Sequence, residues 1–156
     1  MSTERARQEA AAGLEIRQMP VAETRELRQA VLRPHESLEY LAEHEPDDAF
    51  ALGVFEEDRL IAVGFIGRDG EVEAGEPRAW RVRGMATLSE ARGRGAGGAI
   101  LAGLIDHAVE NAATRVWCNA RVSARAFYER GGLRVVSEVF DVAQIGPHLV
   151  MEWRAV

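Results

Sequence analysis

The sequence predicts an α/β domain built around a mixed β-sheet. Three observations lead to this prediction: apolar strand patterns lie in adjacent pairs in the first half, strands and helices alternate in the second half, and a glycine-rich segment at residues 92–98 precedes a helix pattern. Adjacent strands favour antiparallel hairpins, whereas a β-α-β-α-β order favours parallel pairing. The 156 residues suit one domain, which buries about 70% of its unfolded surface.

The first half is expected to hold four strands and two helices. Pro20 ends the first strand, and Leu27 and Val31 repeat at the spacing of a helix. Ser37 is a good N-cap for a second, short helix, and residues 57–58 suit the turn of a hairpin. The expected strands cover residues 15–19, 49–56, 59–66 and 80–88, and the helices cover residues 22–32 and a short segment after Ser37.

The second half is expected to alternate strands with helices. Leu101, Leu104, Ile105 and Ala108 repeat at helical spacing and predict an amphipathic helix directly after the glycine-rich segment. The expected strands cover residues 114–120, 134–141 and 148–154, the helices residues 97–112 and 122–130, and a turn residues 145–147. Residues 67–77 are expected to form a loop, and residues 1–13 a flexible leader before a single domain over residues 14–156.

The amino-acid composition indicates which binding partners and which cellular compartment are expected for this protein. The net charge is −6 and all 19 basic residues are arginine, which disfavours nucleic-acid binding and excludes catalysis by lysine. No apolar run approaches the ~20 residues of a membrane span, so we expect no membrane partner. Cys118 is the single cysteine; it suits a cytoplasmic protein, and we expect it to be a packed core thiol. The four histidines show no ligand spacing, so no metal is expected.

The glycine-rich segment predicts a site for phosphate or pyrophosphate. Glycine has no Cβ to shield the backbone N–H groups. The start of the next helix adds unpaired N–H groups and the positive end of the helix dipole, and arginines can add charge-assisted contacts. The residues expected to form this site are Arg92, Gly93, Arg94, Gly95, Ala96, Gly97 and Gly98.

Two motifs overlap in this segment. Residues 93–98 spell G-x-G-x-x-G, the dinucleotide fingerprint, but residues 89–91 separate them from the strand and no acid follows at residues 117–119 to bind a ribose. The run from Arg92 to Gly97 instead resembles the Q/R-x-x-G-x-G/A loop that binds the pyrophosphate of acyl-coenzyme A (CoA) in the GNAT superfamily of N-acetyltransferases. A small nucleotide-binding oxidoreductase is the weaker alternative.

A second segment, residues 123–133, resembles the A-x-x-F-Y-x-x-x-G-F helix of the same superfamily. Leu133 stands in place of the usual phenylalanine and Gly131 in place of a bulky apolar residue, which should loosen the packing at this helix end. The resemblance extends over roughly residues 14–154. The matching residues are Ala124, Phe127, Tyr128 and Gly132.

The resemblance implies a GNAT-like mixed sheet of about seven strands, mostly antiparallel, with about four flanking helices. It implies an N-acetyltransferase that moves an acetyl group from acetyl-CoA to a primary amine of unknown identity, and homodimers are common in the family. In this family the backbone of the strand before the loop, here Met85-Ala86-Thr87, contacts the pantetheine arm. Asn119 corresponds to a polar residue near the cofactor, and His35 and His148 fall in loops around the acceptor, where either could act as base. A chain of water molecules is the alternative acceptor of the amine proton. The alternative is a non-catalytic acyl-CoA-binding sensor or interaction module on the same fold.

Tyr128 is the expected general acid. Acyl transfer from a thioester to an amine needs a bound cofactor, a polarised carbonyl and a proton for the departing thiolate. A tyrosine with a pKa near 10 is protonated at neutral pH and can protonate a thiolate whose conjugate acid has a pKa of about 8.5. The sequence shows no Ser-His-Asp or Cys-His arrangement with suitable spacing, so we expect direct attack by the amine without a covalent enzyme intermediate.

Arg81 and Arg83 are candidates for binding the acceptor. Strict alternation along the strand of residues 80–88 places both on one face with Met85 and Thr87. Two arginines on one face of a central strand suit recognition of an acceptor carboxylate or phosphate. The alternative is pairing with acids on a neighbouring strand or loop, such as Glu56, Glu71 or Glu73.

Overall fold

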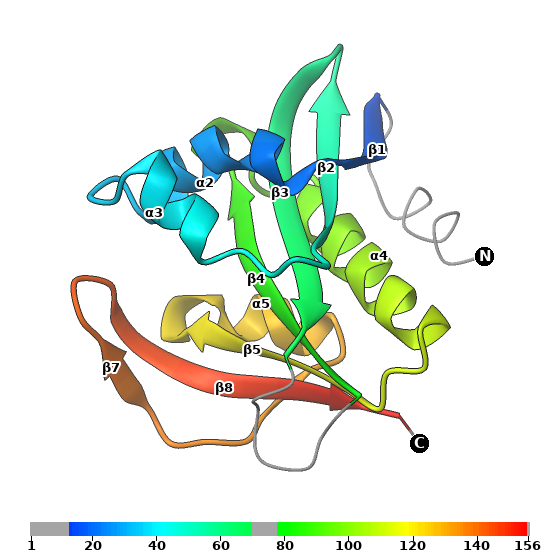
Figure 1. Cartoon of the computed structure of the whole chain (residues 1–156), viewed down its shortest axis with the longest axis vertical. Helices are drawn as coiled ribbons and strands as arrows, with labels where there is room; N and C mark the ends of the chain where they lie inside the picture. The colour runs from blue at the N-terminus through cyan, green and yellow to red at the C-terminus, as the bar shows by residue number, and fades with distance from the viewer. Residues whose placement is uncertain (1–12, 70–77, 156) are drawn as a thin grey trace.

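The computed structural model describes residues 13–69 and 78–155, which form one sheet with helices on both faces (Figure 1). The strands are β1 (Leu14–Met19), β2 (Phe50–Glu56), β3 (Arg59–Arg68), β4 (Ala79–Thr87), β5 (Arg115–Arg121), β6 (Arg134–Val135), β7 (Phe140–Val142) and β8 (Gly146–Arg154). The α-helices are α2 (Arg25–Leu32), α3 (Leu38–Glu43), α4 (Ala96–Glu110) and α5 (Arg125–Arg130). Short 3-10 turns, η1 (Val21–Thr24), η2 (Ser89–Ala91) and η3 (Val122–Ala124), precede α2, α4 and α5.

The sheet forks between β4 and β5. Its strand order is β1-β2-β3-β4-β5-β8-β6, with β7 also paired to β8, and every pairing is antiparallel except that of β4 with β5. These two parallel strands pair only from Ala79 to Arg81 and from Arg115 to Trp117. Beyond this point β4 continues upward beside β3, while β5 runs to the left beside β8 (Figure 1). The predicted mixed, mostly antiparallel sheet is therefore confirmed, and its antiparallel and parallel portions meet at β4.

A β-bulge interrupts β4 and corrects the expected alternation of its side chains. Phe65 of β3 pairs with Arg83 and Val63 pairs with Ala86, so β4 holds one residue more than β3 over this stretch. Gly84 adopts a left-handed φ of 65° at the bulge, a conformation that glycine adopts without strain. Consequently Met85 packs toward α4, whereas the arginines before the bulge face the side of α2. The expectation that Arg81 and Arg83 share a face with Met85 and Thr87 is wrong.

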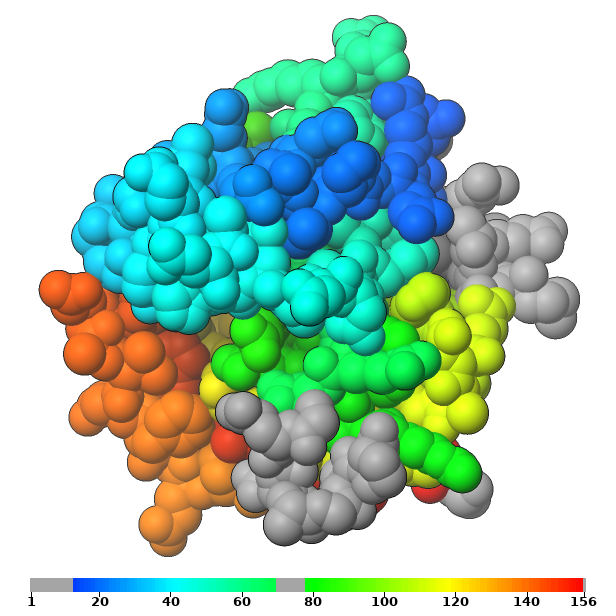
Figure 2. Space-filling view, viewed as in Figure 1, coloured from blue at the N-terminus to red at the C-terminus, as the bar shows by residue number. Residues whose placement is uncertain are grey.

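Two helical layers enclose the sheet. α4 packs on β2, β3 and β4, and its Ile100, Leu101 and Leu104 are fully buried in the main core. On the opposite face α2 covers β3 and β4, where Leu27 packs with Val63 and Ala86. In the space-filling view the α2 and α3 layer forms the upper part of the visible face (Figure 2). The amphipathic pattern of residues 97–112 thus identified the helix that carries the glycine-rich segment at its start.

Local signals explain most of the element boundaries. The Ser37 side chain accepts a hydrogen bond from the Tyr40 N–H at 3.0 Å, as expected for the cap of α3. Glu57 and Asp58 both have positive φ, 49° and 68°, as a type I′ hairpin turn between β2 and β3 requires. The expected turn at 145–147 is displaced, because β8 already begins at Gly146 and the positive φ angles lie at Gln144 and Gly146.

The expected strand over residues 134–141 is divided into β6 and β7. Both parts pair with β8, but at separate positions. Between them the Val136 N–H still donates to the Val150 carbonyl at 2.9 Å, while the Ser137 hydroxyl accepts the hydrogen bond of the Val150 N–H at 2.8 Å. A side chain therefore replaces a backbone partner, and the regular ladder is interrupted there.

Two expected segments fall largely outside the described residues. These are the leader at residues 1–13, of which only Gly13 is described, and the loop at residues 67–77, of which only residues 67–69 are described. Over residues 13–69 and 78–155, no helix has the length and apolar character that a membrane crossing requires.

Candidate active site

A cleft of about 1280 Å³ opens where β4 and β5 separate. The glycine-rich segment and the start of α4 line one part of it, and α5 lines a second part. The ends of α2 and α3 and the start of β8 line the remainder. Met85, Ala86, Thr87 and Asn119, which the resemblance assigns to the cofactor, all lie in its wall.

The glycine-rich segment presents an uncovered helix N-terminus to this cleft. Gly95 is the N-cap of α4 with a left-handed φ of 83°, and no side chain caps the helix. The N–H groups of its first turn therefore have no partner within the helix, and no acid lies in that turn. A Cβ built on Gly93 or Gly98 would meet nothing within 4 Å. Gly93, Gly95, Ala96, Gly97 and Gly98 all line the cleft, so the segment has the shape and polarity of an anion site.

The two arginines of this segment differ in placement. Arg92 lines the cleft and is exposed, and within the described residues it makes no ion pair. Arg94 does not line the cleft, because its guanidinium is paired with the Glu56 carboxylate at the end of β2. The hydrogen bonds from Arg94 hold the pKa of Glu56 below its usual range. Of the two predicted phosphate contacts, the geometry supports Arg92 and not Arg94.

Tyr128 lies on α5 at the opposite wall of the cleft. Its side chain is buried, its ring meets that of Phe127 edge to face at 5.0 Å, and within the described residues its hydroxyl makes no hydrogen bond. Burial raises the pKa of Tyr128 well above that of an exposed phenol, so the hydroxyl holds its proton at neutral pH. The pKa of the neighbouring Cys118 thiol rises to about 12, also through burial. Cys118 is thus the packed core thiol that the sequence predicts.

The helix end after Tyr128 shows how the departures from the family motif are accommodated. Leu133, in place of the usual phenylalanine, is buried in the core, and its N–H donates to the Tyr128 carbonyl at 3.0 Å. A Cβ built on Gly131 would lie 2.3 Å from Leu101. A side chain at this position would have to displace Leu101, so the glycine lets α5 pack closely against α4.

Arg81 and Arg83 line the cleft on the α2 side, but both are paired with an acid. The Asp69 carboxylate lies 3.8 Å from Arg81 and 3.4 Å from Arg83, and Arg83 also donates to the His44 carbonyl at 3.0 Å. Arg81 stacks over the Trp117 ring at 4.8 Å. Pairing with a loop acid was the expected alternative to acceptor binding, although Asp69 was not among the acids considered.

The two histidines expected around the acceptor are placed differently. His35 lies 3.4 Å from the Glu36 carboxylate and does not line the cleft. His148 lines the cleft at the start of β8 and is buried. Its Nδ1 lies 2.8 Å from the Gly146 carbonyl. Since a carbonyl only accepts, Nδ1 carries the proton, and Nε2 of the neutral ring is free to accept one.

Sequence reasoning did not select four of the arginines that line the cleft, Arg28, Arg33, Arg121 and Arg130. Arg121 ends β5 and donates to the Leu32 carbonyl at 2.9 Å, and Arg33 follows Leu32 in the chain. Arg121 shares its strand face with Asn119, two residues earlier, so alternation along this strand could have identified it. No local signal identifies Arg33, because it lies in an irregular connection whose position depends on the packing of α2.

Comparison with known proteins shows that the chain belongs to the GNAT family of acetyltransferases. The family model described as "Acetyltransferase (GNAT) family" matches residues 14–132. The chain is 36% identical over 141 residues to the uncharacterized N-acetyltransferase YitI of Bacillus subtilis (strain 168), with 88% of this chain and 94% of that protein covered.

Solved structures share the fold at low sequence identity. Escherichia coli ElaA superposes with a TM-score of 0.73 at 17% identity, over 90% of this chain and 99% of that one. The ribosomal-protein-S18-alanine N-acetyltransferase of Escherichia coli has a TM-score of 0.71 at 14% identity, over 90% of this chain and 93% of that one. At these identities the likeness shows the arrangement of strands and helices.

Proposed function

We propose that this chain transfers an acetyl group from acetyl-CoA to a primary amine by direct attack. The observation that carries the proposal is the combination, in one cleft, of an uncovered helix N-terminus and a buried phenol without a hydrogen-bond partner in the described residues. The first suits the pyrophosphate of CoA and the second suits a proton donor. Acetyl-CoA is the general donor of the family, and as bound substrate it supplies the reactive thioester.

In this proposal, different residues bind the cofactor, donate a proton and accept a proton. The N–H groups at the start of α4, together with Arg92, bind the pyrophosphate, and the unpaired part of β4 offers backbone groups to the pantetheine arm. As the amine nitrogen bonds to the thioester carbon and the C–S bond breaks, Tyr128 donates its proton to the departing sulfur. His148 Nε2 accepts the proton that the amine loses. No covalent enzyme intermediate is required.

The test is release of free CoA from acetyl-CoA in the presence of a panel of primary amines. An enzyme releases CoA in step with formation of the acetylated amine. A sensor or interaction module on the same fold would bind CoA tightly in calorimetry but release none with any amine, and this outcome would replace the proposal. A His148→Gln variant tests the base: kcat should fall while KM for acetyl-CoA is retained, and an unchanged kcat would remove His148 from the mechanism.

A further inference from the structure

The charge of the cleft differs from that of the whole chain. The net charge of the protein is −6, yet no aspartate or glutamate is among the described residues that line the cleft, whereas seven arginines are. The field in such a cleft favours anions over cations. The phosphates of CoA account for the arginine nearest the glycine-rich segment. The seven are Arg28, Arg33, Arg81, Arg83, Arg92, Arg121 and Arg130.

Most arginines on the α2 side of the cleft are already paired with an acid. Arg28 forms a buried ion pair with Glu45, and Arg81 and Arg83 share Asp69. Arg33 and Arg121 differ, since within the described residues neither pairs with a carboxylate. Arg121 donates instead to the Leu32 carbonyl, a neutral acceptor that does not compensate the guanidinium charge.

The fold brings the side chain of Arg121 to the backbone next to Arg33. Arg121 is bonded to the residue directly before Arg33, although the two segments are 89 residues apart in the chain. Arg121 also pairs with His148 in the ladder between β5 and β8, and all three residues line the cleft. Guanidinium groups bind carboxylates through two parallel N–H···O bonds. An anion site therefore lies beside the histidine proposed to take the proton of the amine.

We infer that the acceptor is a small amine that also carries a carboxylate, as an amino acid does, and that Arg33 and Arg121 bind this carboxylate. The inference rests on the proposed function and specifies its acceptor. A carboxylate held by the two arginines would keep the amine of the same molecule near His148. A polyamine fits the described lining less well, because this lining contains no acid to bind a second ammonium group.

Matched acceptors test this inference with the full-length protein. CoA release is measured with each of the twenty standard amino acids, with the carboxamide of each, and with spermidine. Loss of charge-assisted hydrogen bonds corresponds to roughly a 10- to 100-fold effect, so kcat/KM should be at least about 10-fold higher for the preferred amino acid than for its carboxamide. Equal or faster CoA release with carboxamides or spermidine overturns the inference but leaves the proposed function intact. No CoA release with any amine overturns both.

Two variants assign the site to its residues. Arg33→Gln and Arg121→Gln should raise KM for the preferred amino acid about 10-fold or more. Neither variant should change the KM for the carboxamide of this amino acid or the KM for acetyl-CoA. Arg33→Gln is the cleaner variant, because Arg33 has no ion pair in the described residues whose loss could affect folding. Arg125→Gln is the matched control, since Arg125 is exposed on α5, pairs with Glu129 and does not line the cleft. If both cleft variants kept the wild-type KM for the preferred amino acid, Arg33 and Arg121 would not be the residues that bind its carboxylate.

Discussion

Arg94 and Glu56 form a two-pronged ion pair that connects the start of α4 to the end of β2. The Nη1 and Nη2 groups of Arg94 donate to the two oxygens of Glu56 at 3.1 Å and 2.7 Å. The pair holds this arginine away from the cleft, although its neighbour Arg92 lines the cleft. Two arginines of the same glycine-rich segment thus have different environments: Arg92 is available to a ligand, whereas Arg94 connects the loop to the sheet.

The first prediction separates these two tasks. Arg92→Met should weaken CoA binding about 10-fold or more, because a charge-assisted contact to phosphate is lost. Arg94→Met should leave the affinity within about threefold, because loss of an exposed ion pair has a small effect. Isothermal titration calorimetry with CoA measures both. A larger loss in Arg94→Met than in Arg92→Met would show that the Glu56 pair opens when CoA binds.

A second prediction concerns Gly98, which faces open space in the first turn of α4. Gly98→Leu should put a side chain into the phosphate site and weaken CoA binding at least about 10-fold, while the better helix propensity of leucine keeps or raises stability by up to ~1 kcal/mol. Gly98→Ala is the control with one added methyl group. Gly95 is unsuited to this test, because a side chain at its φ of 83° would strain the backbone itself. Unchanged CoA affinity in Gly98→Leu would place the phosphates elsewhere.

A third prediction tests Tyr128 as the acid. Tyr128→Phe keeps the ring and its contact with Phe127, so CoA affinity should be retained, whereas kcat should fall about 10²–10⁴-fold, the usual contribution of general acid catalysis. Because burial raises the pKa of Tyr128, the wild-type phenol stays protonated through pH 9, and its ionisation should not lower activity between pH 6 and 9. Steady-state kinetics across this range provide the measurement. Full kcat in Tyr128→Phe would make Tyr128 a core residue only.

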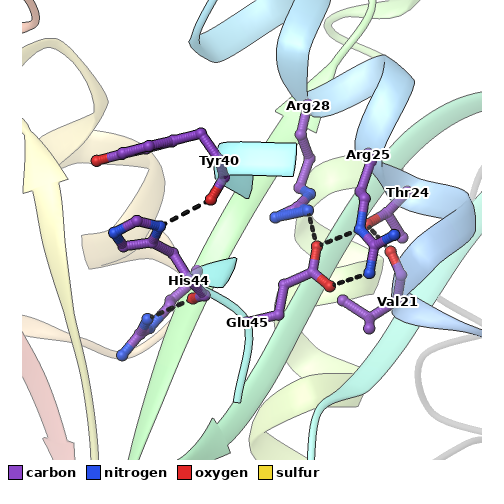
Figure 3. Close-up of polar contacts among 8 residues, drawn as sticks. Val21, Thr24, Arg25, Arg28, Tyr40, His44 and Glu45 are labelled. Atoms are coloured by element: carbon purple, nitrogen blue, oxygen red, sulfur yellow. Dashed lines mark hydrogen bonds and ion pairs between the residues drawn. The ribbon is translucent and has the colours of Figure 1, made fainter. Parts of the chain in front are cut away.

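A fourth prediction concerns the ion cluster that joins α2 to the segment after α3. Glu45 lies between Arg25 and Arg28 (Figure 3), and the side chains of Glu45 and Arg28 are only 5% and 6% exposed. Burial lowers the pKa of Arg28, and Glu45 opposes this effect. Glu45→Gln leaves a buried guanidinium without its counter-charge, which should lower the free energy of unfolding by about 3 kcal/mol. Urea unfolding measures the change.

The control for this cluster is Glu43→Gln, because Glu43 is exposed two residues earlier. Its effect should stay within about 0.5 kcal/mol, as for other surface substitutions. If Glu45→Gln were no more destabilising than Glu43→Gln, the buried pair would contribute nothing net to stability.

The fifth prediction is a pH dependence of stability that arises from His107. Its ring stacks on Phe50 at 3.7 Å and meets Trp80 edge to face at 5.5 Å. Burial lowers the pKa of His107, while the charges of Glu110 and Asp48 oppose this shift. The unfolded chain, with a histidine pKa near 6.5, binds the proton more readily than the folded protein. The stability is therefore complete above about pH 6.5 and falls as the pH decreases toward the folded pKa.

A His107→Phe variant keeps a ring on Phe50 and removes the titration. Between pH 7.5 and pH 5 the free energy of unfolding should fall more in the wild type than in the variant. Between pH 7.5 and pH 8.5 it should change by the same amount in both proteins. Urea unfolding at these pH values gives the comparison. Equal losses in both proteins would mean that His107 titrates alike when folded and unfolded.

The sequence alone was sufficient to predict the class of protein and the glycine-rich part of the cleft. Glycines at positions 93 and 95, followed at once by an apolar helix pattern, specify an uncovered helix start, because backbone conformation and helix formation depend on neighbouring residues. Tyr128 could be placed for the same reason, since its helix follows a clear strand. The mixed, mostly antiparallel pairing of the sheet followed from the order of the strands.

Which charged groups reach the cleft depends on how the elements pack in three dimensions. One extra residue at the Gly84 bulge moved Met85 to the α4 side and left Arg81 and Arg83 on the other, because alternation along a strand does not survive a one-residue insertion. Arg94 met Glu56 and Arg121 met Leu32 across 38 and 89 residues of chain. Such contacts depend on how separate elements pack, which neither local propensity nor the spacing within one motif specifies.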